Sequence, residues 1–110
     1  MDTAEAKLTH QAVRQNLERF AQTGSTTLST YAISADTFCA LGEWLRIEKK
    51  HGRNETLHRL HREFHDRAGK VVRLIASKQM EAATSMLDRE FTAVEDDLMS
   101  ALDDLQIHAQ

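Results

Sequence analysis

Apolar residues recur near the start of this chain at alternating steps of four and three positions, the spacing of one face of an α-helix. Asp2 is a helix-capping residue type, and Glu5 follows it three positions later, as in a capping box. The pattern predicts a first helix that begins near Asp2. Its stripe is Ala6, His10, Val13, Leu17 and Phe20. His10 thus stands where an apolar residue would be expected.

Residues 24–34 are rich in Ser and Thr and open with Gly24, which predicts a connection longer than most helix–helix loops. A second helix is predicted over residues 36–50. Lys49 and Lys50 in its last turn, with Gly52 just beyond, are typical of a helix C-terminus. The apolar side of this helix contains Phe38, Leu41, Trp44 and Leu45.

A third helix is predicted from the capping residue Asn54 to Ser77, and His65 flanks its apolar stripe of Leu57, His61, Phe64, Ala68, Val71 and Ile75. A fourth helix is predicted over residues 80–108, with the stripe Leu87, Phe91, Val94, Leu98, Ala101 and Leu105. We interpret its acidic residues as a solvated helix face: Glu95, Asp96, Asp97, Asp103 and Asp104.

The chain contains no proline and only four glycines among 110 residues, so little interrupts these helices. We therefore expect an all-α single domain over residues 1–110, folded as an antiparallel four-helix bundle with a longer first connection. The net charge is −3 and no basic patch stands out, which argues against nucleic acid as a partner. The N-terminus does not resemble a signal peptide, and no apolar run approaches the roughly 18 residues of a membrane span. We expect a cytoplasmic protein without membrane contact by this domain.

The surplus of histidines on apolar stripes needs a chemical explanation. Burying a neutral imidazole without partners costs roughly 1–3 kcal/mol. His61 and His65 are four positions apart, so both face one side of a helix and can present two nitrogens to one metal. The same spacing is also common among surface histidines. Likewise, His10 alone could be a hydrogen-bonded core residue.

Cys39, the only cysteine, lies near the start of the second predicted helix, where a helix N-terminus favours the thiolate. A small buried apolar residue is the simpler alternative. Gly42 follows one turn later, and a glycine inside a helix costs up to about 1 kcal/mol relative to alanine. Close helix approach, or room for a metal and its ligands, would account for it.

Together His10, Cys39, His61 and His65 form a closed tetrahedral set suited to zinc, with copper as a second possibility. We predict one zinc site in the bundle core. Because protein ligands fill all four positions, no place is left for a catalytic water, and we do not expect an enzyme.

These residues also carry a family resemblance. The run Cys39-Ala40-Leu41-Gly42-Glu43-Trp44 resembles the Cys-x-Leu-Gly-x-Trp signature of the chemoreceptor zinc-binding (CZB) domain family. The stretch from Leu60 to His65, followed by Ala68-Gly69, resembles the His-x-x-x-His helix of that family. His10 stands about where the family places its first histidine. Val13 departs from the pattern, because the family often has Trp there. On this basis Gly42 and Trp44 are expected to support the site.

The resemblance implies a homodimeric helical domain attached to a bacterial chemoreceptor or a diguanylate cyclase. In such domains three histidines and one cysteine hold zinc, and the cysteine reacts with oxidants such as hypochlorous acid. The chain is therefore expected to be a zinc-binding sensor domain, with Cys39 as its redox-reactive residue. Its partner would be a receptor signalling coiled coil or a cyclase domain.

Four alternatives remain. One is a Cys–His hydrolase, although the sequence shows no sign of the pocket and oxyanion hole that it would need. Glu48-x-x-His51 and Glu55-x-x-His58 fit the Glu-x-x-His spacing of di-iron bundles, although Gly52 indicates a helix break between them. His58 could also compete with His61 for the metal. Finally, the chain could be a purely structural helical dimerisation module.

Overall fold

The computed structural model describes residues 3–24 and 40–108, and every regular element among them is a helix. The helices are α1 (Thr3–Thr23), α3 (Ala40–Lys50) and α4 (Glu55–Ala76), followed by one continuous helix. That last helix comprises α5 (Met80–Met86), the π-helical segment η2 (Leu87–Phe91) and α6 (Thr92–His108). The prediction of an all-α fold is confirmed.

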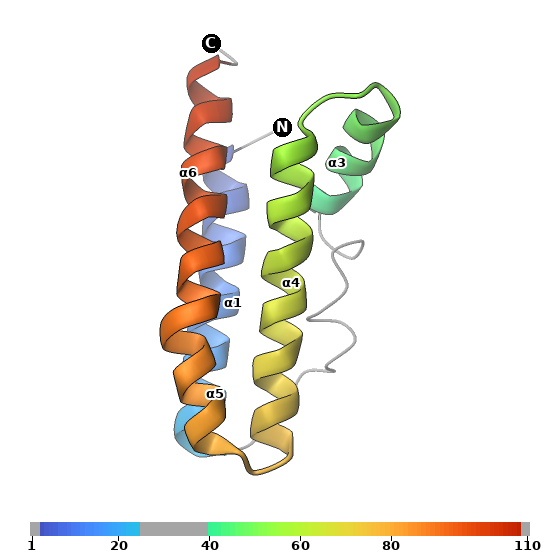
Figure 1. The fold of residues 1–110 in the computed structure, drawn as a ribbon. Helices are drawn as coiled ribbons and strands as arrows, with labels where there is room; N and C mark the ends of the chain where they lie inside the picture. Colours follow the sequence, from blue (N-terminus) through green and yellow to red (C-terminus); the bar gives the residue numbers. More distant parts are fainter. Residues whose placement is uncertain (1–2, 25–39, 109–110) are drawn as a thin grey trace.

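Three long helical segments lie side by side, and the short α3 packs against one of them (Figure 1). α1 and α4 run in the same direction, and the α5–α6 helix returns beside both. α3 contacts α4 near the start of α4 and runs opposite to it. The predicted cap at Asp2, the connection after Gly24, and the first residues of the second helix, Phe38 included, fall outside the described residues. The antiparallel four-helix topology therefore stays a prediction.

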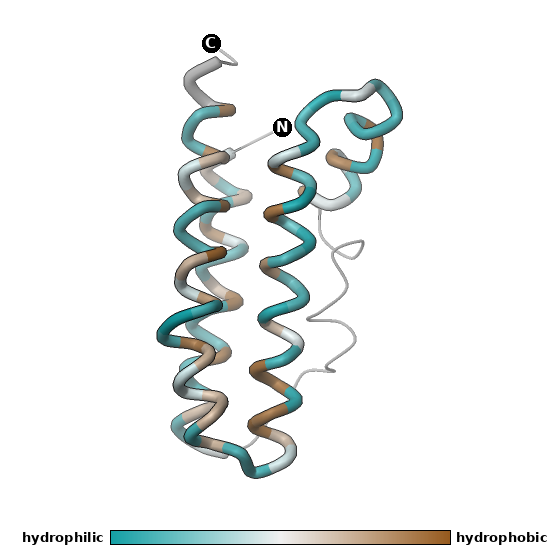
Figure 2. Tube along the Cα trace, viewed as in Figure 1, coloured by the Kyte–Doolittle hydropathy of each residue, from teal (hydrophilic) through white to brown (hydrophobic). Residues whose placement is uncertain are grey.

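The buried core follows the predicted stripes closely. Brown, hydrophobic positions of the long helices face inward in Figure 2. The buried apolar residues include Leu17, Phe20, Leu41, Leu45, Leu57, Phe64, Ala68, Val71, Ile75, Leu87, Phe91, Val94 and Leu98. Val13, Ala101 and Leu105 are only partly buried, while Leu102 is completely buried. The stripe on α6 thus turns toward Leu102 rather than Ala101.

The π-helical segment η2 explains how the last helix keeps one face on the core. Ala83, Leu87 and Phe91 are buried at successive steps of four residues. Four residues turn an ideal α-helix by about 400°, so each such step drifts by about 40° around the axis. A π-turn has more residues per turn and takes up this drift. The hydroxyl of Thr92 donates to the carbonyl oxygen of Leu87 at 2.8 Å, across the wide turn.

One prediction for α6 is wrong. Glu95 does not belong to a solvated face, because it is only 7% exposed. It lies four residues after Phe91 and three before Leu98, which places it on the helix side that meets α1. There its Oε1 atom accepts a hydrogen bond from Nη1 of Arg14 at 2.7 Å.

Polar contacts fix the corner between α3 and α4. Asn54 precedes α4, as predicted, but it adopts a left-handed conformation with φ 56° and its side chain makes no capping hydrogen bond. Instead, its Nδ2 donates to Oε1 of Glu48 at 2.9 Å, and Arg53 donates to Oε2 of the same carboxylate. Gly52 supplies a second positive φ of 68°. The short α3 is thereby tied to the start of α4.

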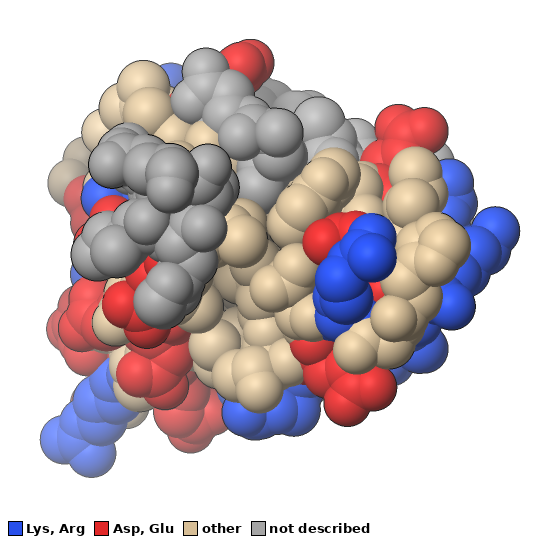
Figure 3. Space-filling model, turned by 90° about the horizontal axis from the view of Figure 1, so that it is seen from above, with Lys and Arg blue, Asp and Glu red and all other residues tan. Residues whose placement is uncertain are grey.

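None of the helices in the described ranges is both long enough and apolar enough to cross a membrane. The end of the molecule seen in Figure 3 carries acidic and basic side chains interspersed around an uncharged centre. No basic patch dominates this face.

Candidate metal centre

Three histidine side chains converge inside the helical core. His10 comes from α1, whereas His61 and His65 lie one turn apart on α4. Their exposed fractions are 1%, 0% and 5%. Nε2 of His61 lies 3.0 Å from Nε2 of His10 and 3.1 Å from Nε2 of His65. Among the side chains that the structure describes, these three form a group able to hold a metal ion.

The rings meet through their edges rather than their faces. Ring centroids are 5.0 Å apart for His10 and His61 and 4.6 Å apart for His61 and His65, with interplanar angles of 74° and 77°. This arrangement aims nitrogens at a common point, as ligands of one ion must do. Zinc–nitrogen bonds of 2.0–2.1 Å at tetrahedral angles separate the ligand nitrogens by about 3.3–3.4 Å. The observed spacings are within a few tenths of an ångström of that value.

A backbone carbonyl fixes the orientation of His10. Nδ1 of His10 lies 2.7 Å from the carbonyl oxygen of Ala6, and only a protonated Nδ1 can donate to that oxygen. In neutral His10 the lone pair is then on Nε2, the atom nearest to His61. Metal-ligating histidines commonly donate their other ring N–H to a carbonyl in this way. The described residues therefore fit a metal ion.

Burial keeps the imidazoles of His10 and His61 neutral at pH 7. The pKa of His10 falls from 6.5 to about 4, mainly because of burial; the hydrogen bond to Ala6 opposes this shift, and the nearby His65 contributes a smaller lowering. Burial, followed by the nearby His65, His10 and His58, lowers the pKa of His61 to about 2. Neutral imidazole is the form that binds a metal, so His10 and His61 are in the ligand form at pH 7.

The metal-free chain is expected to lose stability as the pH falls from 7 to 5. The unfolded histidines bind protons below about pH 6.5, whereas His10 and His61 in the folded chain do not until about pH 4 or below. Protons therefore favour the unfolded state, by about 2 kcal/mol per histidine at pH 5. Urea unfolding of chelator-treated protein at the two pH values measures this difference. A His61→Gln variant should lose part of the pH dependence, while His51→Gln, at an exposed position, should keep it. Equal stability of the parent chain at both pH values would contradict the assignment.

Two phenylalanines from the predicted apolar stripes also border the site. The ring of Phe64 lies 5.1 Å from that of His10 and 5.5 Å from that of His65, centroid to centroid. Phe91 packs behind Phe64 at 5.0 Å, and both phenylalanines are completely buried. The apolar stripes predicted their burial, but the sequence does not show that they back the histidines.

The other predicted site residues divide into two groups. Cys39 falls outside the described residues, so its role as ligand and redox-reactive thiol stays a prediction. Gly42 is buried on α3, and Trp44 is partly buried against the core. Their supporting roles also stay predictions.

The residues of the di-iron alternative do not converge with the histidine cluster. Glu48 binds Arg53 and Asn54 at the helix corner, and His51 is exposed beside it. His58 is partly buried and close enough to contribute to the lowered pKa of His61, yet it is not one of the three converging histidines.

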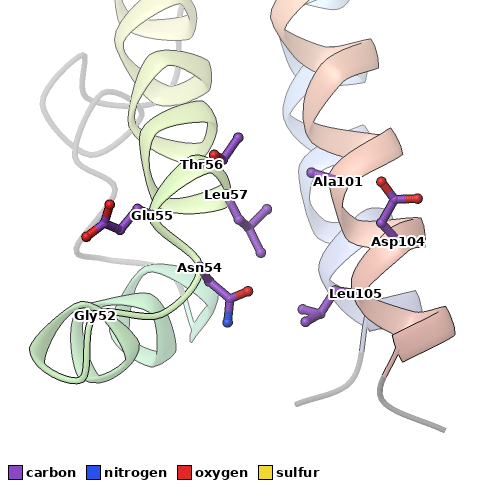
Figure 4. Close-up of a pocket in the computed structure, with 8 residues that line it drawn as sticks. All are labelled: Gly52, Asn54, Glu55, Thr56, Leu57, Ala101, Asp104 and Leu105. Atoms are coloured by element: carbon purple, nitrogen blue, oxygen red, sulfur yellow. The ribbon is translucent and has the colours of Figure 1, made fainter.

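A groove of about 570 Å³ lies at the end of the molecule, between the start of α4 and the C-terminal part of α6. Leu57 and Leu105 point into it from the two helices, while Glu55 points away (Figure 4). None of its lining residues is a histidine. Its two carboxylates, Glu55 and Asp104, come from different helices and are not part of a group able to hold a metal ion. The histidine cluster is therefore the stronger candidate site.

Comparisons of the chain with protein-family models, with curated proteins and with solved structures find no match. The candidate site is thus defined by its own geometry.

Proposed function

We propose that this chain is a zinc-binding sensor domain in which His10, His61 and His65, together with Cys39, hold one zinc ion. The observation that carries the proposal is the convergence of three buried Nε2 atoms from two helices, two pairs of them 3.0 and 3.1 Å apart. Apolar residues at these three buried positions would avoid the cost of burying polar imidazoles, so a shared ligand gives the histidines a reason to be there.

The chemistry of the donors favours zinc. Imidazole nitrogen suits zinc and copper, whereas magnesium and calcium prefer oxygen ligands. A thiolate as fourth donor would complete a structural zinc set. Cys39 directly precedes Ala40, the first residue of α3, and α3 packs against the helix that carries His61 and His65. This connectivity supports Cys39 as the fourth ligand.

A regulatory role fits the site better than catalysis. A site closed by four protein ligands has no position for a reacting water. The resemblance to CZB domains adds the expected setting: a cytoplasmic, homodimeric domain joined to a chemoreceptor signalling coiled coil. A diguanylate cyclase is the alternative output. The signal in either case is an oxidant such as hypochlorous acid, or zinc itself.

Cys39 carries the proposed oxidant response. Bound zinc would hold its side chain as the nucleophilic thiolate. The thiolate sulfur attacks hypochlorous acid, and the net reaction converts thiolate and HOCl to sulfenic acid and chloride. Sulfur is oxidised by two electrons and the chlorine is reduced. A sulfenic acid is a poor ligand, so Cys39 leaves the histidines and the start of α3 is free to shift.

Replacement of Cys39 by Ser is expected to abolish the reaction with hypochlorous acid at the site while His10, His61 and His65 retain part of the zinc. The test is zinc content, measured on protein without a histidine tag, beside the consumption of one equivalent of oxidant. His58→Ala serves as the matched control and should behave as the parent chain. Oxidant-driven changes of equal size in the Cys39→Ser variant would rule out this mechanism.

Sensing of zinc itself is the second candidate, favoured by the way the site joins α1 to α4. Loss of the metal would loosen the contact between these helices. Titration of zinc against helix content and oligomeric state separates the two models. A zinc sensor fills and empties within the tested range, whereas an oxidant sensor is occupied at rest.

A further inference from the structure

Arg14 connects the region of the histidine cluster to α6. It lies one helical turn after His10 on α1, and its guanidinium carbon is 5.7 Å from the ring centroid of Phe91. Its Nη1 donates to Oε1 of Glu95 at 2.7 Å, and its Nε donates to Glu18 at 2.9 Å. Arg14 is therefore held by an aromatic face and two carboxylates.

A contribution to the stability of the fold does not by itself explain why Arg14 and Glu95 form a buried pair. The side chain of Glu95 is 9% exposed and that of Arg14 is 25% exposed. Oε2 of Glu95 is buried without a hydrogen-bond partner among the described residues. A half-satisfied buried carboxylate costs free energy, and such pairs often stabilise less than apolar residues of similar volume. What such a pair can provide is a unique placement of one helix on another.

The site depends on such a placement. His61 and His65 share one helix, so their spacing is fixed locally. His10 comes from a different helix. The shift of α1 along its axis and its rotation about that axis must both be correct for Nε2 of His10 to lie 3.0 Å from Nε2 of His61. A column of side-chain contacts leads from Arg14 through Phe91 and Phe64 to the rings of His10 and His65.

We infer that Arg14 and Glu95 are positioning residues for the metal site, which hold α1 on α6 so that His10 completes the ligand set. This inference rests on the proposed zinc site. It also links metal occupancy to the α1–α6 contact, because a change at one end of the column alters the packing at the other.

The chain offers a matched control in a second ion pair between the same two helices. Nζ of Lys7 lies 2.6 Å from Oδ1 of Asp103, but these side chains are 30% and 51% exposed. An exposed pair is screened by water and contributes little. Asp103→Asn should therefore leave the zinc affinity unchanged.

The test is the zinc dissociation constant, measured by chelator competition, for Glu95→Gln, Arg14→Met, Arg14→Lys and Asp103→Asn. We expect Glu95→Gln and Arg14→Met to weaken binding by about ten-fold, within the range of residues that support metal ligands. Arg14→Lys keeps the charge and should recover most of that loss. With cobalt as probe, the visible spectrum of Glu95→Gln should shift, as it does when a ligand is displaced.

The decisive comparison places Glu95→Gln in a His10→Ala background. A positioning role predicts no further loss there, because the ligand that is positioned has been removed. The same fold-loss in both backgrounds, or losses in Asp103→Asn equal to those in Glu95→Gln, would overturn the inference. If Glu95→Gln does not fold, the Arg14→Met and Arg14→Lys pair carries the same comparison. If the parent chain binds no zinc, the proposed function is refuted. If the parent chain and Glu95→Gln bind zinc with equal affinity, only the positioning role is refuted.

Discussion

Replacement of His61 by Ala is expected to weaken zinc binding by about a hundred- to a thousand-fold, since a structural zinc ion gains roughly 10–16 kcal/mol from four ligands. His61 is the central residue of the cluster, because its Nε2 lies within 3.1 Å of the corresponding atom of both other histidines. Its removal takes away one ligand and the contact that orders the other two. The dissociation constant from chelator competition measures the loss.

His58→Ala provides the control for this experiment. His58 lies one turn before His61 on the same helix and is partly buried, but it is not part of the converging group. Its replacement should leave the dissociation constant unchanged. A larger effect of His58→Ala than of His61→Ala would mean that the ligand set has been assigned to the wrong histidine.

Replacement of Phe64 by Ala is expected to lower the free energy of unfolding by about 3–5 kcal/mol, the usual cost of emptying a large aromatic site in a core. Phe64 is completely buried and contacts Phe91, His10 and His65. The cavity also frees the two imidazole rings to rotate, so the zinc affinity of the folded chain should fall as well. Urea unfolding and chelator competition measure the two effects separately.

Phe20→Ala is the matched control for Phe64. Phe20 is 2% exposed on α1, and its described ring contact is with Arg19 rather than with a histidine. Its loss should destabilise the chain by a similar amount and leave the zinc affinity of the folded protein unchanged. Equal losses of affinity in the two variants would show that Phe64 acts through global stability alone. Leucine at either position is the milder change if alanine prevents folding.

The sequence predicts the histidine cluster because two kinds of signal coincide. His10, His61 and His65 lie on or beside apolar helical stripes, and the four-residue spacing of the last two places them on one helix face. Periodicity also predicts helix α4 almost to the residue, with Asn54 before it and Ser77 after it. These features depend on local spacing, which a sequence records directly.

Features that depend on contacts between distant segments are harder to predict. Glu95 lies in a run of acidic residues, which predicts a solvent-facing position. The π-helical segment η2 and the four-residue step from Phe91 instead turn Glu95 toward Arg14, 81 positions away in the sequence. The sequence predicts that the side chain of Asn54 caps α4, but this side chain donates a hydrogen bond to Glu48 instead. The apolar residues Ala83, Leu87 and Phe91 recur at steps of four, and this repeat is a sequence signal for the π-turn and for the burial of Glu95 at the next step.

X-ray absorption at the zinc K-edge, on the untagged chain purified without added metal, tests the central claim most directly. We predict one zinc ion per chain, with three nitrogen neighbours at about 2.0–2.1 Å and one sulfur at about 2.3 Å. A chain that retains no zinc, or zinc surrounded only by oxygen, would contradict the account.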